Sequence, residues 1–370
     1  MSLVLFFLAC LLPALVISWL VTWLMRRWAP RWGLIDEPAE RKVHTTPTPL
    51  GGGVGLYCGF VIPIVVSFGA IYALPRETLS SVLPDGWGEH IPGALSRGPQ
   101  LATILGAGTL LAVMGLLDDY KGLPWQPRLA VQLGIAVALA VSGVRASVFV
   151  EAQWVGVVVT VIWIVVLINA FDFRDNMDGL SAGIGLISAL VFAAIMLRYS
   201  GTPRWLVGGS LLILAGSLIG FLVHNRPPAK IFMGDAGSTF LGLMLACLTL
   251  VGTFYDPQQP GRHVMLAPIC VLAVPLFDLT TVVFIRLKEG RSPFHPDKNH
   301  FSHRLVELGL SRYHAVLTVH LVTLTTGLAA LLLYDMSSLS RTGLVAALVL
   351  CVLTVITILE TVGRRRNGNT

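Results

Sequence analysis

Residues 153–197, QWVGVVVTVIWIVVLINAFDFRDNMDGLSAGIGLISALVFAAIML, decide the fold, because two apolar runs there enclose an acidic segment. The runs cover residues 154–170 and 179–197, and each is close to the roughly 20 residues that a helix needs to cross a bilayer. Asp172, Asp175 and Asp178 lie between them. Carboxylates at a membrane edge are unfavourable unless a metal ion or protons compensate them. The segment therefore predicts two membrane helices joined at a functional site.

Similar apolar runs recur along the whole chain. Of its 370 residues, 55% are hydrophobic and 12% are charged, and the mean hydropathy is +0.76, which is far from an ordinary soluble domain. We expect an all-α, polytopic membrane protein with about eleven transmembrane helices. The expected spans are roughly 2–25, 50–74, 101–117, 129–144, 154–170, 179–197, 205–223, 237–254, 265–285, 313–334 and 342–362.

The basic residues predict the orientation in the membrane. With eleven spans, 19 of the 26 Lys and Arg residues fall on one side and 7 on the other. The richer side is expected to be cytoplasmic, which places the N-terminus outside and the C-terminus inside. The net charge of +6 suits an anionic membrane surface or anionic substrates and does not indicate nucleic-acid binding. We expect one transmembrane domain over residues 1–370, with its functional site built from the cytoplasmic loops 26–50, 118–128, 169–179, 224–238 and 286–312.

Adjacent carboxylates at Asp118 and Asp119 end the third apolar run. They repel one another, and Mg²⁺ would remove that penalty, since it prefers carboxylates together with phosphate oxygens. A solvated helix end with Lys121 as partner is the alternative. Asp235 stands just before a Gly-Ser helix start, either as an N-cap or as a metal ligand.

Asp175 and Asp178 are three residues apart, so on a helical turn they would share a face. Capping of the following helix could account for one of them but not for both. Asn169 adds a neutral polar group at the end of the preceding run.

Two basic segments lie on the same predicted side. Arg41 to Gly53 combines basic residues, hydroxyl groups and a glycine run, which suits a phosphate or forms a simple turn into the next span. In the last loop, His300 and His303 have i, i+3 spacing. A histidine pair could bind zinc, but the neighbouring Arg and Lys residues favour an anionic substrate. Asp278, inside an expected span, is either a functional acid or a buried hydrogen-bond partner.

Five segments in this order resemble one family, the polyprenyl-phosphate N-acetylhexosamine-1-phosphate transferases of the glycosyltransferase family 4 type. The match runs from about Arg41 to Gly309, and it is nearest to the undecaprenyl-phosphate GlcNAc-1-phosphate transferases. The segments that carry it are Arg41-Lys42 with Thr46-Pro47-Thr48-Pro49-Leu50-Gly51-Gly52, Asp118-Asp119, Asn169-Ala170-Phe171 with Asp175 and Asp178-Gly179-Leu180, Phe232-Met233-Gly234-Asp235-Ala236-Gly237-Ser238, and Ser292-Pro293 to His303.

The resemblance implies transfer of N-acetylhexosamine 1-phosphate, most simply GlcNAc 1-phosphate, from a UDP-sugar to undecaprenyl phosphate, with release of UMP. It implies Mg²⁺ as cofactor, with Mn²⁺ as a substitute, a site facing the cytoplasm of a bacterial inner membrane, and membrane lipid as partner; a homodimer is left open. The implied metal ligands are Asp235, Asp118 and Asp119, with His300 and His303 as further catalytic residues. The implied substrate-binding residues are Arg41, Lys42, Thr46, Asn169, Asp175, Asp178, Asn225 and Arg304.

The chain departs from the family pattern at several positions. Asp172 stands where the family usually has Asn, Arg174 follows two residues later, and Asn176 replaces a common Gly. Ser302 interrupts the histidine run. Two other functions remain as alternatives: the phospho-MurNAc-pentapeptide translocase of peptidoglycan synthesis, and a proton-coupled transporter or lipid flippase, whose acids should lie at the membrane midplane.

Overall fold

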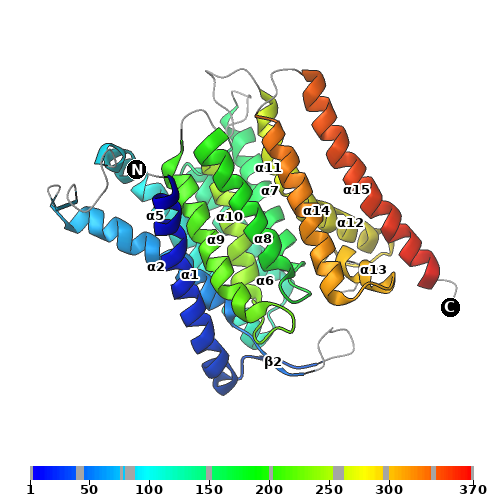
Figure 1. Cartoon of the computed structure of the whole chain (residues 1–370). Coiled ribbons are helices and arrows are strands. Elements are labelled where there is room, and N and C mark those ends of the chain that lie inside the picture. The colour runs from blue at the N-terminus through cyan, green and yellow to red at the C-terminus, as the bar shows by residue number, and fades with distance from the viewer. Residues whose placement is uncertain are drawn as a thin grey trace.

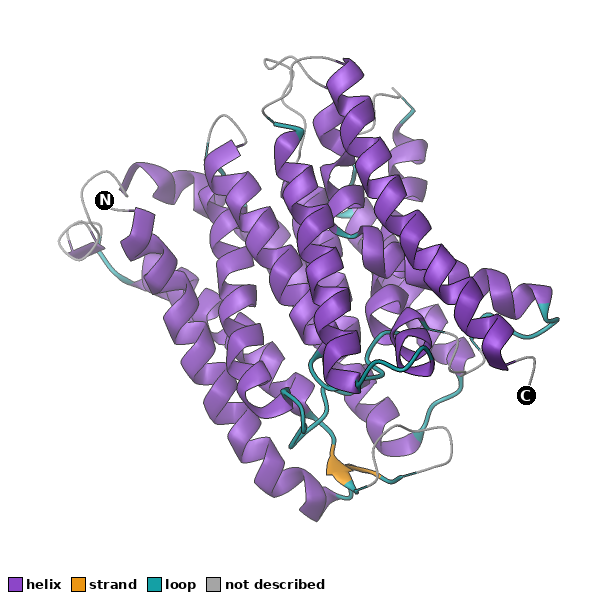
Figure 2. Ribbon diagram, turned by 45° about the vertical axis from the view of Figure 1, so that its right-hand side comes forward, coloured by secondary structure: helices purple, strands orange, loops and turns teal. Residues whose placement is uncertain are grey.

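The computed structural model describes residues 3–38, 46–75, 78–79, 88–146, 152–199, 203–252, 262–294, 300–334 and 339–367, which form an all-α bundle (Figures 1 and 2). The α-helices are α1 (Leu3–Trp28), α2 (Gly52–Ala73), α4 (Ile91–Ser96), α5 (Gly98–Lys121), α6 (Trp125–Val141), α7 (Gln153–Asp172), α8 (Leu180–Ala194), α9 (Trp205–Asn225), α10 (Asp235–Gly252), α11 (Ala267–Val271), α12 (Ala273–Lys288), α13 (Phe301–Glu307), α14 (Arg312–Leu332) and α15 (Leu339–Asn367). Short helical turns occur at η1 (Ala29–Trp32), η2 (Gly88–His90), η3 (Ile195–Tyr199) and η4 (Arg262–Leu266). Two-residue strands β1 (Ile35–Asp36) and β2 (Thr48–Pro49) pair antiparallel.

The expected spans are helical in the structure. In the described residues, nine helices are long and apolar enough to cross a membrane. The expected span 129–144 corresponds to α6, a shorter apolar helix, and the expected span 265–285 corresponds to a helix pair that is bent. The chain is therefore a multi-pass membrane protein.

The bend between α11 and α12 corrects the expectation of one continuous span. The pair passes the length and hydropathy criteria together but is bent by 68° at Leu272. The physical cause is Pro275, which has no N–H to donate to the carbonyl of Val271 one turn earlier. The broken helix directs α12 away from the line of α11 and carries Asp278 toward the loops.

Helix α10 lies at the centre of the bundle and contacts α7, α5 and α2. Its span is 83% buried, against 17% for α1 at the periphery. Glycines allow these helices to approach closely at the N-terminal end of α10. A Cβ at Gly53 in α2 would overlap the backbone of Gly237, and a Cβ at Gly115 in α5 would overlap the backbone of Asp235 and Ala236. These contacts bring the end of α5 to the start of α10.

The polar loops gather at one end of the bundle. In Figures 1 and 2, α1 begins at the opposite end from β2, and α15 finishes on the side of β2. This arrangement agrees with an odd number of crossings. The N-outside orientation itself stays a prediction.

Candidate active site

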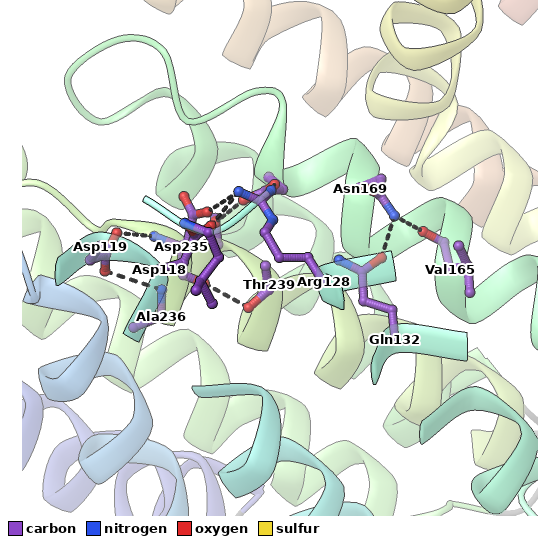
Figure 3. Close-up of polar contacts among 12 residues, drawn as sticks. Asp118, Asp119, Arg128, Gln132, Val165, Asn169, Asp235, Ala236 and Thr239 are labelled. Atoms are coloured by element: carbon purple, nitrogen blue, oxygen red, sulfur yellow. Dashed lines mark hydrogen bonds and ion pairs between the residues drawn. The ribbon is translucent and has the colours of Figure 1, made fainter. Parts of the chain in front are cut away.

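Three aspartates from distant parts of the sequence meet at one arginine. Arg128, in the first turn of α6, forms ion pairs with Asp118 at the end of α5, Asp172 at the end of α7 and Asp235 at the start of α10. Its Nη2 lies 2.8 Å from Asp172 Oδ2, and its Nη1 lies 2.8 Å from Asp235 Oδ2 and also contacts Asp118 Oδ2. Figure 3 shows Arg128 beside Asp118 and Asp235. We call Asp118, Asp172, Asp235 and Arg128 the acidic cluster.

Neutral donors hold two of the carboxylates in place. The Ser238 hydroxyl donates to Asp172 Oδ1 at 2.9 Å, and the backbone N–H of Leu123 donates to Asp118 Oδ1 at 2.5 Å. The side chains of Asp118 and Asp172 are almost fully buried, whereas Asp235 is 31% exposed. One guanidinium faces three carboxylates, so the cluster has excess negative charge and favours a further cation.

The neighbouring Asp175 is affected by its own burial and, to a smaller extent, by these charges. Burial raises the pKa of its carboxyl to about 8, and the nearby charges of Asp172 and Asp119 add to the rise. A hydrogen bond from the Gly234 backbone acts in the opposite direction and is too weak to restore the usual value.

Asp119 faces away from Arg128 and caps helix α10. Its Oδ1 accepts the Asp235 N–H at 2.8 Å and its Oδ2 accepts the Ala236 N–H at 3.4 Å (Figure 3). A carboxylate at a helix N-terminus satisfies unpaired N–H groups and interacts favourably with the helix dipole. The two adjacent aspartates therefore have different partners. Asp118 joins the acidic cluster, and Asp119 fixes the helix that carries Asp235.

Asn169 holds helix α6 against α7. Its Nδ2 donates to Gln132 Oε1 at 2.7 Å and to the Val165 carbonyl at 2.8 Å (Figure 3). Gln132 is one turn after Arg128 in α6, so this contact positions the arginine. Asn169 was predicted to bind substrate, and in the structure its amide nitrogen is engaged within the protein.

Asp178 and Asn225 join the loop after α7 to the loop before α10. Asp178 Oδ2 accepts the Ala229 N–H at 2.9 Å. Asn225 Oδ1 accepts the Gly179 N–H, and its Nδ2 donates to the Ile231 carbonyl, both at 2.9 Å. These contacts fix the two loops that bear Asp175 and Asp235.

The first loop contributes a turn. The N–H groups of Gly52 and Gly53 donate to the carbonyls of Phe232 and Met233, at 2.9 and 2.8 Å. They are therefore not available to a phosphate, contrary to one of the two interpretations of the sequence. The Thr46 carbonyl accepts the Thr48 hydroxyl at 3.1 Å. Arg41 and Lys42 lie outside the described residues.

The segment from His300 to Arg304, which we call the histidine segment, belongs to the same loop region. His300, just before α13, contacts Asp278 of α12, with Nδ1 lying 2.8 Å from Asp278 Oδ2. The rings of His300 and His303 are 6.3 Å apart. Arg304 is almost buried and pairs with Glu307 at 2.9 Å. Ser302 donates to Asn176 at 3.0 Å, so the segment adjoins the loop that carries Asp175.

Arg128 and Asp172 were not among the predicted site residues. Arg128 was counted as a basic residue of a cytoplasmic loop, and Asp172 was noted for its departure from the family. A signal was present, because clustered acids next to apolar runs need a cation from the protein and Arg128 precedes an expected span by one residue. The sequence could not show that Asp172 and Arg128 meet.

Comparison with known proteins agrees with this geometry. A family model described as "Glycosyl transferase family 4" matches residues 101–253, which contain the whole acidic cluster. A decaprenyl-phosphate N-acetylglucosaminephosphotransferase of Mycolicibacterium smegmatis is 35% identical over 94% of this chain and 88% of the relative.

The chain belongs to glycosyl transferase family 4.

Two further relatives in this family extend the comparison. A protein of the same name from Mycobacterium tuberculosis is 36% identical over 84% of this chain and 78% of its own length. The undecaprenyl-phosphate alpha-N-acetylglucosaminyl 1-phosphate transferase of Escherichia coli is 27% identical over 82% of this chain and 77% of its own length. The names of these relatives describe transfer of N-acetylglucosamine phosphate to decaprenyl or undecaprenyl phosphate.

Proposed function

We propose that the protein transfers GlcNAc 1-phosphate from UDP-GlcNAc to a polyprenyl phosphate and releases UMP. The observation that carries this proposal is the convergence of Asp118, Asp172 and Asp235 on Arg128, in a chain whose relatives are named for this transfer. In the reaction, an oxygen of the lipid phosphate attacks the β-phosphorus of UDP-GlcNAc. The bond from that phosphorus to the UMP oxygen breaks, and UMP leaves with the electron pair.

Charge neutralisation is the main requirement of such a transfer, because two anionic phosphates must approach one another. Arg128 supplies a guanidinium at the acidic cluster, and the histidine segment supplies His300, His303 and Arg304. A lipid phosphate monoester has a second pKa of about 6 and is largely dianionic at neutral pH, so it needs little help from a base. We assign Asp118 to orientation of the site rather than to proton transfer.

Mg²⁺ is part of the proposal. In the described residues, no three His, Cys, Asp or Glu side chains form a metal-binding group, and Arg128 stands among the carboxylates. The donors nevertheless fit, because carboxylate oxygens with excess negative charge are what Mg²⁺ prefers. Asp118 and Asp235 would hold the ion, and Asp172 lies beside them. Asp119 would support the site indirectly, because it accepts the backbone N–H of Asp235. When bound, Mg²⁺ would neutralise charge that develops on the diphosphate.

An assay with radiolabelled UDP-GlcNAc, MgCl₂ and purified protein tests the function. Label should move into the butanol-extractable lipid with undecaprenyl or decaprenyl phosphate as acceptor, and UMP should appear in equal amount. Omission of the metal or the Asp235→Asn substitution should abolish transfer. Preference for UDP-MurNAc-pentapeptide would support the translocase instead. No extractable label with any UDP-N-acetylhexosamine would refute the proposal.

We further propose that the site faces the cytoplasm of a bacterial plasma membrane. The support is the excess of basic residues in the loops on this side of the predicted topology. A cytoplasmic site would match the location of soluble nucleotide sugars.

A further inference from the structure

Buried polar contacts join the loop after α7 to the histidine segment, and the proposed reaction does not use them. Asp278 Oδ1 lies 3.3 Å from Arg174 Nη2 and accepts the Phe301 N–H at 2.8 Å. Asp278 Oδ2 lies 2.8 Å from His300 Nδ1. Arg174 and Asp278 are each 2% exposed, and His300 is 4% exposed. Arg174, His300 and the Phe301 N–H thus share one carboxylate, that of Asp278 in the broken helix.

A second contact links the same two segments. The Ser302 hydroxyl donates to Asn176 Oδ1 at 3.0 Å. Asn176 follows Asp175 in sequence, and Ser302 precedes His303. The contact therefore joins the loop after α7 to the histidine segment. On each side it is adjacent to a candidate site residue, Asp175 in the loop and His303 in the histidine segment.

These contacts pair positions where the chain departs from the family pattern. Asn176 and Ser302 are both departures, and they contact each other. Arg174 lies two residues after the departure at Asp172, and its partner is Asp278 of the broken helix.

The carboxylate of Asp278 also fixes the imidazole of His300. With Nδ1 directed at Asp278, the ring presents Nε2 on its other side, which sets its orientation. Removal of one member of a buried charged pair leaves the other uncompensated, which costs more than the pair itself contributes. In the described part of the chain, Arg174 Nε and Nη1 have no hydrogen-bond partner. Arg174 therefore contacts Asp278 through Nη2.

We propose that Arg174, Asp278, Asn176 and Ser302 form a clasp that positions His300 and His303 against the loop bearing Asp175 and Asp178 for sugar-phosphate transfer. The inference rests on the proposed function and deepens it. The four members of the clasp are positioning residues: they act through the groups they hold and do not touch the reacting phosphates.

A double-mutant cycle tests the ion pair of the clasp. Arg174→Gln and Asp278→Asn should each lower kcat by about 10- to 100-fold, with KM for UDP-GlcNAc changed by less than about 3-fold. Because the two residues act as a unit, the double variant should lose no more than the worse single variant. Losses that multiply in the double variant would overturn the proposal.

The second contact provides milder variants that keep the buried charges. Ser302→Ala should lower kcat by about 3- to 10-fold, and Ser302→Thr, which keeps the hydroxyl, should restore most of it. Asn176→Ala should match Ser302→Ala. The control is Glu289→Gln, which removes an exposed ion pair with Arg291 just beyond α12 and should leave kcat unchanged.

Thermal unfolding in detergent separates positioning from a merely structural role. Variants that unfold earlier but turn over at the wild-type rate per folded molecule would refute the clasp. The wild-type assay tests the proposed function by itself. If the wild type prefers another nucleotide sugar, the same ratios among variants, measured with that donor through UMP release, still decide whether the clasp exists.

Discussion

Arg128 forms ion pairs with three carboxylates at once, so one positive charge compensates three negative charges. Two of these carboxylates are also held by neutral donors: Asp118 accepts the Leu123 N–H, and Asp172 accepts the Ser238 hydroxyl. The arginine therefore sets both the geometry and the charge of the acidic cluster.

The first prediction concerns the loss of the Arg128 charge. Arg128→Gln should lower the free energy of unfolding by about 2 kcal/mol in metal-free buffer, since it leaves carboxylates without a partner at a partly exposed site. Saturating MgCl₂ should recover most of this stability, because a divalent cation supplies the missing charge. The measurement is the melting temperature in detergent with and without the metal, with Arg291→Gln as the exposed control. No difference between metal-free and metal-loaded samples would contradict the prediction.

The second prediction concerns Asp175 and pH. Its pKa is about 8 in the folded protein, against about 4 in an unfolded chain. The folded state therefore holds a proton that the unfolded state releases. In metal-free buffer, the contribution of Asp175 to stability should be complete below about pH 4 and should fall as pH rises toward 8, by about 1.4 kcal/mol per pH unit. Asp175→Asn should lose this share of the pH dependence, which melting temperatures between about pH 6 and about pH 8 would measure. Parallel curves for the two proteins would show that Asp175 is ionised throughout.

At the scale of elements, close helix crossings place the acidic cluster. Helices α2, α5 and α10 meet at Gly53, Gly115 and Gly237, where a Cβ would overlap the backbone of a neighbouring helix. Asp118 lies less than one turn after Gly115, so its distance from Asp235 depends on this crossing.

The third prediction uses two glycines of the same helix. Gly115→Ala should separate α5 from α10, lower the melting temperature and reduce transfer by at least about 100-fold. Gly106→Ala is the matched control, because a Cβ at Gly106 meets nothing within 4 Å. That variant should keep full activity and equal or greater stability, since Ala favours helix more than Gly does. Equal effects of the two substitutions would show that the crossing does not position the site.

At the scale of the whole molecule, the arrangement of helix ends makes the site one-sided. The loops that carry Asp118, Asp172, Asp235 and His300 lie at one end of the bundle, with the end of α15 on the same side (Figures 1 and 2). A transporter would need acids along the bundle. Asp278, the acid nearest to that description, is engaged by Arg174 and His300 at the loop end of a broken helix.

The fourth prediction tests the orientation of the molecule. A fluorescent reporter fused after Thr370 should be active in the cytoplasm, and alkaline phosphatase fused there should be inactive. Alkaline phosphatase inserted in the loop between residues 75 and 100 should be active, because that loop is predicted to lie outside. The reverse pattern would place the acidic cluster outside and remove access to cytoplasmic UDP-GlcNAc.

The sequence by itself determined the class of fold, an all-α protein with many apolar helices, and it predicted the loops that would form the site. Hydrophobic length and charge bias are local properties, so they can be read without a structure. It also pointed to Asp118 and Asp235, since acids next to apolar runs are costly unless something compensates them.

The tertiary structure decided which groups compensate which acids. It assigned Asp119 to the N-terminus of α10, Asn169 to Gln132, and the Gly52 and Gly53 N–H groups to backbone carbonyls. It also brought Asp172 to Arg128 and broke the helix before Asp278. These pairings join residues that are far apart in the sequence, as Gly52 and Phe232 are. They depend on how helices cross, and no local pattern of the sequence encodes that geometry.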